Sequence, residues 1–241
     1  MEIRIFETAE QAAQATAMLV AAQVIKKPDS VLGLPTGSTP VPIYRELVQM
    51  YQKGLVSFAE VTSFNLDEYC RLPEEHECSY HYFMKEQLFD HVDIAADSAH
   101  VPNGNAADLA AEGQAYDAAI EKAGGIDLQL LGIGQNGHIG FNEPVDEFVY
   151  GTHVVDLTPS TVEANKQYFS SEAEMPKQAI SVGIGGIMSA KQIVLLATGA
   201  GKVDAIRKSI REEVVPSMPA SILRMHPNVI FMLDKAAAAG L

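Results

Sequence analysis

The chain has 241 residues, which suits one large α/β domain or two small ones and leaves ample apolar material for a core. Apolar residues make up 47% and charged residues 20%, a composition that excludes disordered, collagen-like and low-complexity proteins. The 31 acidic and 17 basic residues leave a formal net charge of −14, and there is no basic run. The charge argues against binding to nucleic acid or to an anionic membrane, so an anionic ligand needs local donors.

No apolar stretch is long enough to span a bilayer, and the first residues alternate like a strand and do not form a signal peptide. We therefore expect a cytoplasmic protein. Cys70 and Cys78 are the only cysteines, and they are too few for a disulfide scaffold and not spaced for zinc. They are predicted to be two reduced thiols.

Strands and helices alternate along the chain. Strands are expected at 1–6, 30–34, 60–66, 127–133, 179–184, 192–197 and 228–233. Helices are expected at 8–27, around Ile43, Leu47 and Met50, and at 79–90, 106–123, 159–169, 201–213 and 219–224. This alternation indicates βαβ units, so the predicted α/β fold is a three-layer αβα arrangement with a mostly parallel, Rossmann-like sheet and helices on both faces. No linker or repeat divides the chain, and residues 1–241 are expected to form a single domain.

Ligands of open parallel sheets bind beyond the carboxyl ends of the strands, so the segments that follow strands are the most informative. The first is 34–40, in which Thr36, Gly37, Ser38 and Thr39 precede a helix. Free backbone N–H groups, the helix dipole and three hydroxyls favour an anion such as phosphate at this turn. The ending of a Walker A loop is missing, which argues against a nucleoside triphosphate. Ordinary helix capping by these hydroxyls is the alternative.

The second segment, 64–69, places two adjacent carboxyls, Asp67 and Glu68, after an apolar strand. A carboxylate near apolar neighbours acts well as a general base. Neighbouring residues of extended chain point in opposite directions, so only one of the two is expected to enter a given site. Alternatively, both residues cap the following helix or turn.

The third segment, 131–144, is the most specific. Its start fits the glycine pattern of dinucleotide sites, but Gly140 and Pro144 interrupt helical growth within two turns, which argues against that function. Its glycines, including Gly137, instead describe an irregular loop whose backbone approaches a ligand.

His138 lies in the middle of this loop, and Glu143 follows five residues later. A histidine exchanges a proton near neutral pH, and the carboxylate is suited to fixing its tautomer. A satisfied structural histidine is the alternative. No histidine and acid spacing typical of a metal site occurs, so no metal is predicted. Lys202 begins a helix after the strand at 192–197, where its ammonium is suited either to a phosphate or to the protein surface.

Taken together, the segments 34–40, 64–69 and 134–144, with 102–104 and 223–227, closely resemble the glucosamine-6-phosphate deaminase family in order and spacing. The resemblance covers nearly the whole chain. It implies conversion of glucosamine 6-phosphate and water to fructose 6-phosphate and ammonia, with neither a metal nor an organic cofactor.

The resemblance also implies a role for each segment. His138 would open the pyranose ring, supported by Glu143 and Asn136, while Asp67 would transfer the proton from C2 to C1. The phosphate would be held by Lys202 and by the loop residues Thr36, Gly37, Ser38 and Thr39. Gly137 would present its backbone to the substrate.

The chain departs from the family at three places. Some relatives carry an aspartate where this chain has Asn136, whose amide cannot stabilise an imidazolium as an anion would, so more of this task falls to Glu143. Relatives carry a phosphate-binding arginine at the position of Gln167, and Lys166 is one residue away. The segment 151–156 lacks the basic residues with which hexameric, activated relatives bind an effector. These features predict an unregulated monomer, although a homo-oligomer is not excluded.

Two other functions compete with this interpretation. A 6-phosphogluconolactonase shares the fold and binds a six-carbon sugar phosphate, but it would hydrolyse a lactone. A sugar-phosphate sensor would need a DNA-binding module, and this chain shows no helix-turn-helix extension or basic face.

Overall fold

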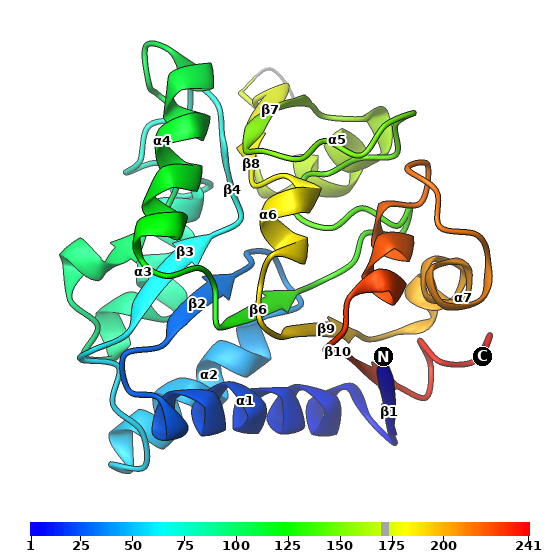
Figure 1. Ribbon diagram of the computed structural model, residues 1–241, viewed down its shortest axis with the longest axis horizontal. Coiled ribbons are helices and arrows are strands. Elements are labelled where there is room, and N and C mark those ends of the chain that lie inside the picture. Colours follow the sequence, from blue (N-terminus) through cyan, green and yellow to red (C-terminus); the bar gives the residue numbers. More distant parts are fainter. Residues whose placement is uncertain (170–173) are drawn as a thin grey trace.

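The computed structural model describes residues 1–169 and 174–241. Within them a seven-stranded sheet crosses the molecule, and every neighbouring pair of its strands is parallel (Figure 1). In spatial order its strands are β1 (Glu2–Phe6), β10 (Val229–Asp234), β9 (Ile193–Ala197), β6 (Leu128–Leu131), β2 (Val31–Leu34), β3 (Thr62–Asn65) and β5 (Ala99–His100). β2, β6, β9 and β10 are buried throughout, as apolar strands covered on both faces must be.

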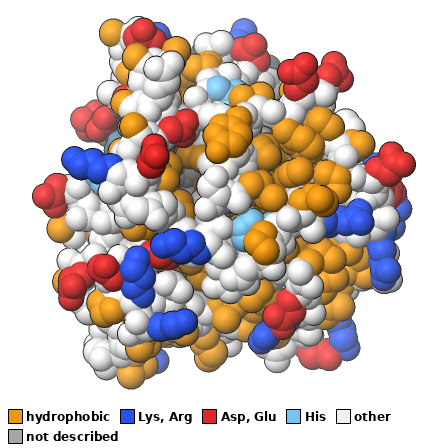
Figure 2. All heavy atoms as spheres, in the orientation of Figure 1, with side chains coloured by type: hydrophobic (Ala, Val, Ile, Leu, Met, Phe, Trp, Pro, Cys, Tyr) orange, Lys and Arg blue, Asp and Glu red, His pale blue; other side chains and the backbone are white. Residues whose placement is uncertain are grey.

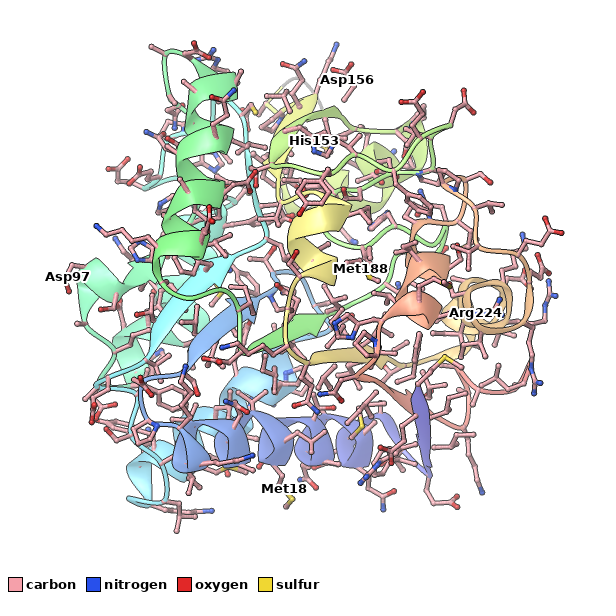
Figure 3. All side chains as sticks on the ribbon, viewed as in Figure 1. Met18, Asp97, His153, Asp156, Met188 and Arg224 are labelled. Carbon is pink, nitrogen blue, oxygen red and sulfur yellow. The ribbon has the colours of Figure 1, made fainter. Side chains whose placement is uncertain are left out.

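Helices cover both faces of this sheet, which confirms the predicted three-layer α/β fold. One face packs against α1 (Ala9–Lys26), α2 (Val41–Gln52) and α3 (Tyr80–Gln87). The other packs against α4 (Leu109–Lys122), α6 (Ile184–Met188), α7 (Val203–Arg211) and the 3₁₀ helix η5 (Pro219–Met225). Figure 3 shows the two sides: Met18 points outward from α1, and Met188 and Arg224 lie across the sheet from it.

A second, antiparallel sheet of three strands corrects the sequence prediction. Its order is β4 (Asp67–Tyr69), β8 (Gln178–Ser181) and β7 (His153–Asp156). The segment 179–184 was expected to belong to the parallel sheet, but its strand pairs antiparallel here, and the helix α6 begins at Ile184. Ala179 of β8 is buried in a separate cluster around Tyr69, and Ile180 is buried as well. This burial makes the strand resemble a parallel one in sequence.

The helices depart from the predicted ranges mainly at their ends. The segment 79–90 divides into α3 and η1 (Phe89–His91), and 219–224 is a 3₁₀ helix. Helix α5 (Pro159–Asn165) continues into η3 (Lys166–Tyr168), and η4 (Ala200–Lys202) precedes α7. Another short 3₁₀ helix, η2 (Ala96–Ser98), leads into β5. No helix of the described residues is long and apolar enough to cross a membrane.

We propose that the two sheets form a single domain. Only Leu66 separates β3 from β4, and its buried side chain belongs to the core of the parallel sheet.

The face seen in Figure 2 carries Lys and Arg side chains interspersed with Asp and Glu. This distribution agrees with the absence of a basic run in the sequence.

Asp127 directly precedes β6, and its side chain connects three segments of the chain at the amino end of the parallel sheet. Its carboxylate accepts hydrogen bonds from Lys27 Nζ at 2.6 Å, from the Val31 backbone N–H at 2.8 Å and from Lys191 Nζ at 2.7 Å. Burial by itself would raise the pKa of Asp127, but the two lysines and the Val31 N–H outweigh it and lower the pKa.

The variant Asp127→Ala is expected to lower the free energy of unfolding by about 2–4 kcal/mol, because two ammonium groups and a backbone N–H lose their partner. A carboxyl with a lowered native pKa stabilises the fold above its unfolded-state pKa, and this contribution is lost as the pH falls through the native value. Urea unfolding measures the difference in free energy of unfolding between the wild type and Asp127→Ala. This difference should therefore decrease as the pH falls. Asp29→Ala, at an exposed aspartate, is the control, and an equal loss in both variants would contradict the assignment.

Candidate functional site

The loops after β2, β3, β6 and β9 surround one cleft at the carboxyl edge of the parallel sheet. The strand order reverses between β2 and β6: β3 and β5 lie beyond β2, and β9 and β10 lie beyond β6. Such a reversal opens a crevice between neighbouring loops. The cleft has a volume of about 330 Å³. Its lining includes Thr36, Gly37, Ser38, Thr39, Asp67, Tyr80, Asn136, His138, Thr161, Asn165, Gln167 and Lys202.

The loop between β2 and α2 offers its hydroxyls to the cleft. Helix α2 has Pro40 at its N-cap and no side chain that caps it, so the hydroxyls of Ser38 and Thr39 do not serve as the predicted alternative, helix capping. Gly37 has a φ of 96°, a conformation that favours glycine, and this bends the loop over the start of the helix. The resulting turn is a suitable anion site.

Lys202 lines the same cleft from the end of η4, after β9. Its Nζ donates a hydrogen bond to the Ile133 carbonyl at 2.5 Å, and burial lowers its pKa. Among the described residues that line the cleft, Lys202 is the only lysine or arginine. Lys166 is not part of the lining and pairs with Glu163 at 2.6 Å, whereas Gln167 lines the cleft.

Asp67 opens β4 at the point where the chain leaves the parallel sheet. Its side chain is only 6% exposed and borders Gly140, where an added Cβ would lie 3.4 Å from Asp67 Oδ2. Burial, and secondarily the charge of Glu68, raise the pKa of Asp67 to about 8. A carboxyl with this pKa is suited to exchanging a proton near neutral pH.

His138 and Glu143 form a pair in the loop after β6. His138 Nδ1 lies 3.5 Å from Glu143 Oε2, and Glu143 is buried behind the ring, outside the lining of the cleft. Asn136 Nδ2 donates to Glu143 Oε2 at 2.8 Å, and Thr161 Oγ1 donates to Oε1. Burial by itself would raise the pKa of Glu143, but His138, Thr161 and Asn136 outweigh it and lower the pKa to about 2. Glu143 is therefore a fixed anion beside the imidazole.

Two glycines of this loop have different tasks. An added Cβ at Gly134 would lie 2.3 Å from His138 Cε1, so the imidazole packs directly on the Gly134 backbone. Gly137, which was expected to present its backbone to the substrate, does not line the cleft. Its N–H donates to the Gly134 carbonyl, and its own carbonyl accepts from the Ala220 N–H. With a φ of 88°, Gly137 forms the turn that carries His138.

Residues for which no role was predicted also line the cleft, among them Tyr80 in α3, Thr161 and Asn165 in α5, and Phe141. Tyr80 stacks on Phe141 with ring centroids 5.9 Å apart. Asn165 Nδ2 donates to the Tyr69 hydroxyl at 3.1 Å. Tyr80, Thr161 and Asn165 follow no strand of the parallel sheet, so the rule that pointed to the other segments did not find them, whereas Phe141 lies in the loop after β6.

Cys70 is buried and Cys78 is partly exposed, and no disulfide joins these two cysteines. Within 1–169 and 174–241, no three His, Cys, Asp or Glu side chains lie together in a way that would hold a metal ion.

Comparison with known proteins shows the family of this chain. The profile of the family described as glucosamine-6-phosphate isomerases/6-phosphogluconolactonase matches residues 6–231. The chain belongs to this family. Two curated relatives named glucosamine-6-phosphate deaminase are similar over most of their length. The one from Clostridioides difficile (strain 630) is 52% identical over 93% of this chain and 90% of its own, and the one from Halothermothrix orenii is 51% identical over 99% of both.

Solved structures of this family have the same fold. The structure of a monomeric glucosamine-6-phosphate deaminase matches all of both chains with a TM-score of 0.97 and 42% identity. The 6-phosphogluconolactonase from Trypanosoma brucei covers the whole chain with a TM-score of 0.75 but only 20% identity, so this likeness shows the fold alone.

The variant Asp67→Asn is expected to be more stable than the wild type, by a margin that grows with pH. The native pKa of about 8 lies above the ordinary value of 3.8, so the native state holds this proton more tightly than the unfolded chain does. The wild type therefore loses stability as the pH rises from about 4 to about 8, and an amide does not titrate.

Thermal unfolding at intervals from pH 5 to 9 measures this margin. The difference in Tm between variant and wild type should widen up to about pH 8 and then level off. The exposed change Asp29→Asn serves as the control. A difference that is constant over the whole range would show that Asp67 does not titrate in this window.

Proposed function

We propose that this protein is a glucosamine-6-phosphate deaminase, which converts glucosamine 6-phosphate and water to fructose 6-phosphate and ammonia. One observation carries the proposal: a buried carboxyl suited to proton transfer, Asp67, and a histidine backed by a fixed anion, His138 with Glu143, share one cleft with a cationic, hydroxyl-rich end. The identities of 52%, 51% and 42% to proteins with this name support the same function.

The substrate's phosphate is assigned to Lys202 and the loop of Thr36, Ser38 and Thr39. An ammonium, three hydroxyls and the N-terminus of α2 together supply the local donors that an anion needs on a protein of charge −14. Gln167 adds an amide but no charge, so Lys202 carries most of the electrostatic attraction.

His138 is assigned to ring opening. Its imidazole takes the proton of the C1 hydroxyl and returns one to the ring oxygen, which gives the open-chain aldehyde. The imidazolium formed on the way lies beside the Glu143 carboxylate, 3.5 Å from Nδ1. The Asn136 amide orients Glu143 through a hydrogen bond but carries no charge. The anion that stabilises the imidazolium is therefore the Glu143 carboxylate.

Asp67 is assigned to proton transfer between C2 and C1. Its carboxylate removes the proton from C2 while the C1 oxygen takes a proton from the substrate's ammonium, which produces an enolamine. The Asp67 carboxyl then returns its proton to C1, which leaves a protonated imine at C2. Water adds to this imine and ammonia leaves, giving the ketone of fructose 6-phosphate. The substrate's ammonium, placed near Asp67, lowers the pKa of this carboxyl and so favours the base form when substrate is bound.

A lactonase would need no base at C2, so the buried Asp67 favours the deaminase. The monomeric state and the cytoplasmic location stay predictions, and the similarity to a monomeric deaminase supports the first of them. An unregulated monomer would show hyperbolic kinetics that N-acetylglucosamine 6-phosphate leaves unchanged.

The wild type is expected to release ammonia from glucosamine 6-phosphate, and Asp67→Asn is expected to lower kcat on the order of 10³-fold while the substrate still binds. A coupled ammonia assay measures turnover, and calorimetry with fructose 6-phosphate measures binding. Hydrolysis of 6-phosphogluconolactone without ammonia release would instead identify a lactonase. Binding without any turnover would favour a sensor.

A matched pair of glycine variants tests the assignment of His138. Gly134→Ala is expected to lower kcat/KM by about 10²-fold, because its methyl group displaces the imidazole. Gly132→Ala adds the same methyl to the same loop, but the nearest atom, Thr39 Cβ, lies 3.8 Å away, and a change of at most about threefold is expected. Equal activity in the two variants would refute a role for His138 in turnover.

A further inference from the structure

Glu68 is a buried acid that the proposed mechanism does not use. It follows Asp67 in β4, and neighbouring residues of a strand point to opposite faces, so its side chain turns away from the cleft that Asp67 lines. The side chain is 2% exposed. An acid this deeply buried needs a compensating set of donors.

Most of those donors come from the first turn of α3, and one comes from β4 itself. Glu68 Oε1 accepts from the backbone N–H of Tyr69 at 2.8 Å and of Tyr80 at 2.9 Å. Oε2 contacts the Tyr80 N–H at 3.0 Å, the His81 N–H at 3.0 Å and the His81 ring Nδ1 at 2.9 Å. The backbone contacts are all donors, and those of Tyr80 and His81 lie at the positive end of α3. Glu68 thus fastens β4 to the start of α3.

The residue held in this way, Tyr80, forms a wall of the cleft. Its hydroxyl is hydrogen-bonded to the side chains of Tyr69 and Thr36, and its ring stacks on Phe141. The Glu68 contacts fix the backbone of Tyr80, so they also determine where this ring stands relative to Asp67 and the loop after β2.

The charge of Glu68 acts on Asp67 as well. The ionisable side chains that interact with the Asp67 carboxyl include Glu68 of β4 and four tyrosines from β4, α2, α3 and α4. Burial raises the pKa of Tyr44, Tyr80 and Tyr116 well above 10, so these tyrosines are neutral. His138 and Lys202 reach the same cleft from the loops after β6 and β9.

We propose that Glu68 is a positioning residue of this site: its carboxylate anchors the wall that carries Tyr80 and acts electrostatically on the neighbouring Asp67. Its effect on turnover rests on the proposed function. Its effect on Asp67 exists in the empty protein and is measured there.

The test is a titration of Asp67 by carbon-13 NMR of its side-chain carboxyl in the protein without substrate. Three variants are compared with the wild type: Glu68→Gln removes the charge, Glu68→Asp keeps the charge but shortens its reach, and Ser79→Ala loosens the same turn without changing any charge. Ser79 Oγ accepts from the Tyr82 N–H at 3.0 Å and caps α3, which makes it a matched control.

Glu68→Gln is expected to lower the titration midpoint of Asp67 by about one pH unit, while Glu68→Asp and Ser79→Ala stay within about half a unit of the wild type. A shift of the same size in Ser79→Ala, or no shift in Glu68→Gln, would overturn the proposal. If Glu68→Gln does not fold, Glu68→Asp still tests the proposal. This variant keeps the negative charge, so an Asp67 midpoint lowered by about one pH unit would refute the electrostatic action of Glu68.

The pH profile of ammonia release then measures the consequence for turnover. The acid limb of kcat/KM in Glu68→Gln should move to lower pH by the same amount as the NMR midpoint. Glu68→Asp should keep the limb in place but raise KM, because the Tyr80 wall is less firmly held. If the wild type releases no ammonia while the NMR shift is present, the proposed function fails and the action of Glu68 on Asp67 stands.

Discussion

The junction between β3 and β4 has a single residue, Leu66, and this short connection places Asp67 between two sheets. Leu66 is held in the core of the parallel sheet, and Tyr69, two residues beyond Asp67, is held in the cluster beneath the antiparallel sheet. With Leu66 and Tyr69 both fixed, Asp67 is buried, 6% exposed, and lines the cleft. Its burial, and hence its raised pKa, follows from how the chain passes from one sheet to the other.

A second carboxyl, buried behind the cleft, has the opposite environment. Glu143 is also buried, but it receives donors from Asn136 and Thr161 and lies beside His138, so its pKa falls to about 2. Asp67 receives no such set of donors from the part of the chain that the structure describes, and its pKa rises to about 8. Two carboxyls whose environments separate their pKa values in this way are suited to different tasks, one as a proton carrier and the other as a permanent anion.

Local sequence predicted the parallel sheet well, because its central strands are short apolar runs between amphipathic helices. The antiparallel sheet was not predicted: β4 and β7 have three and four residues, β7 is partly exposed, and the partner of β8 is chosen by contacts distant in sequence. The strand prediction at 179–184 therefore found the strand but assigned it to the wrong sheet.

The candidate site was predictable where residues follow parallel strands, as Thr36, Asp67 and His138 do. Alternation in an extended chain also predicted that only one of Asp67 and Glu68 would enter the cleft. Tyr80 and Thr161 line the cleft because α3 and α5 pack beside it. The local amino-acid pattern of a helix does not show where that helix packs. Gly137 was assigned to the substrate because glycine indicates close approach, but here its conformation serves the turn.

Lys202 is the only lysine or arginine among the described residues that line the cleft. This affects how an anionic substrate approaches the protein. A protein of net charge −14 repels a sugar phosphate at long range, and salt screens this repulsion over a distance of about 8–10 Å. The attraction of Lys202 acts at contact, where the buried ammonium is screened much less. Moderate ionic strength therefore speeds the approach of substrate more than it weakens the final contact, which is the reverse of the behaviour of an electrostatically steered enzyme.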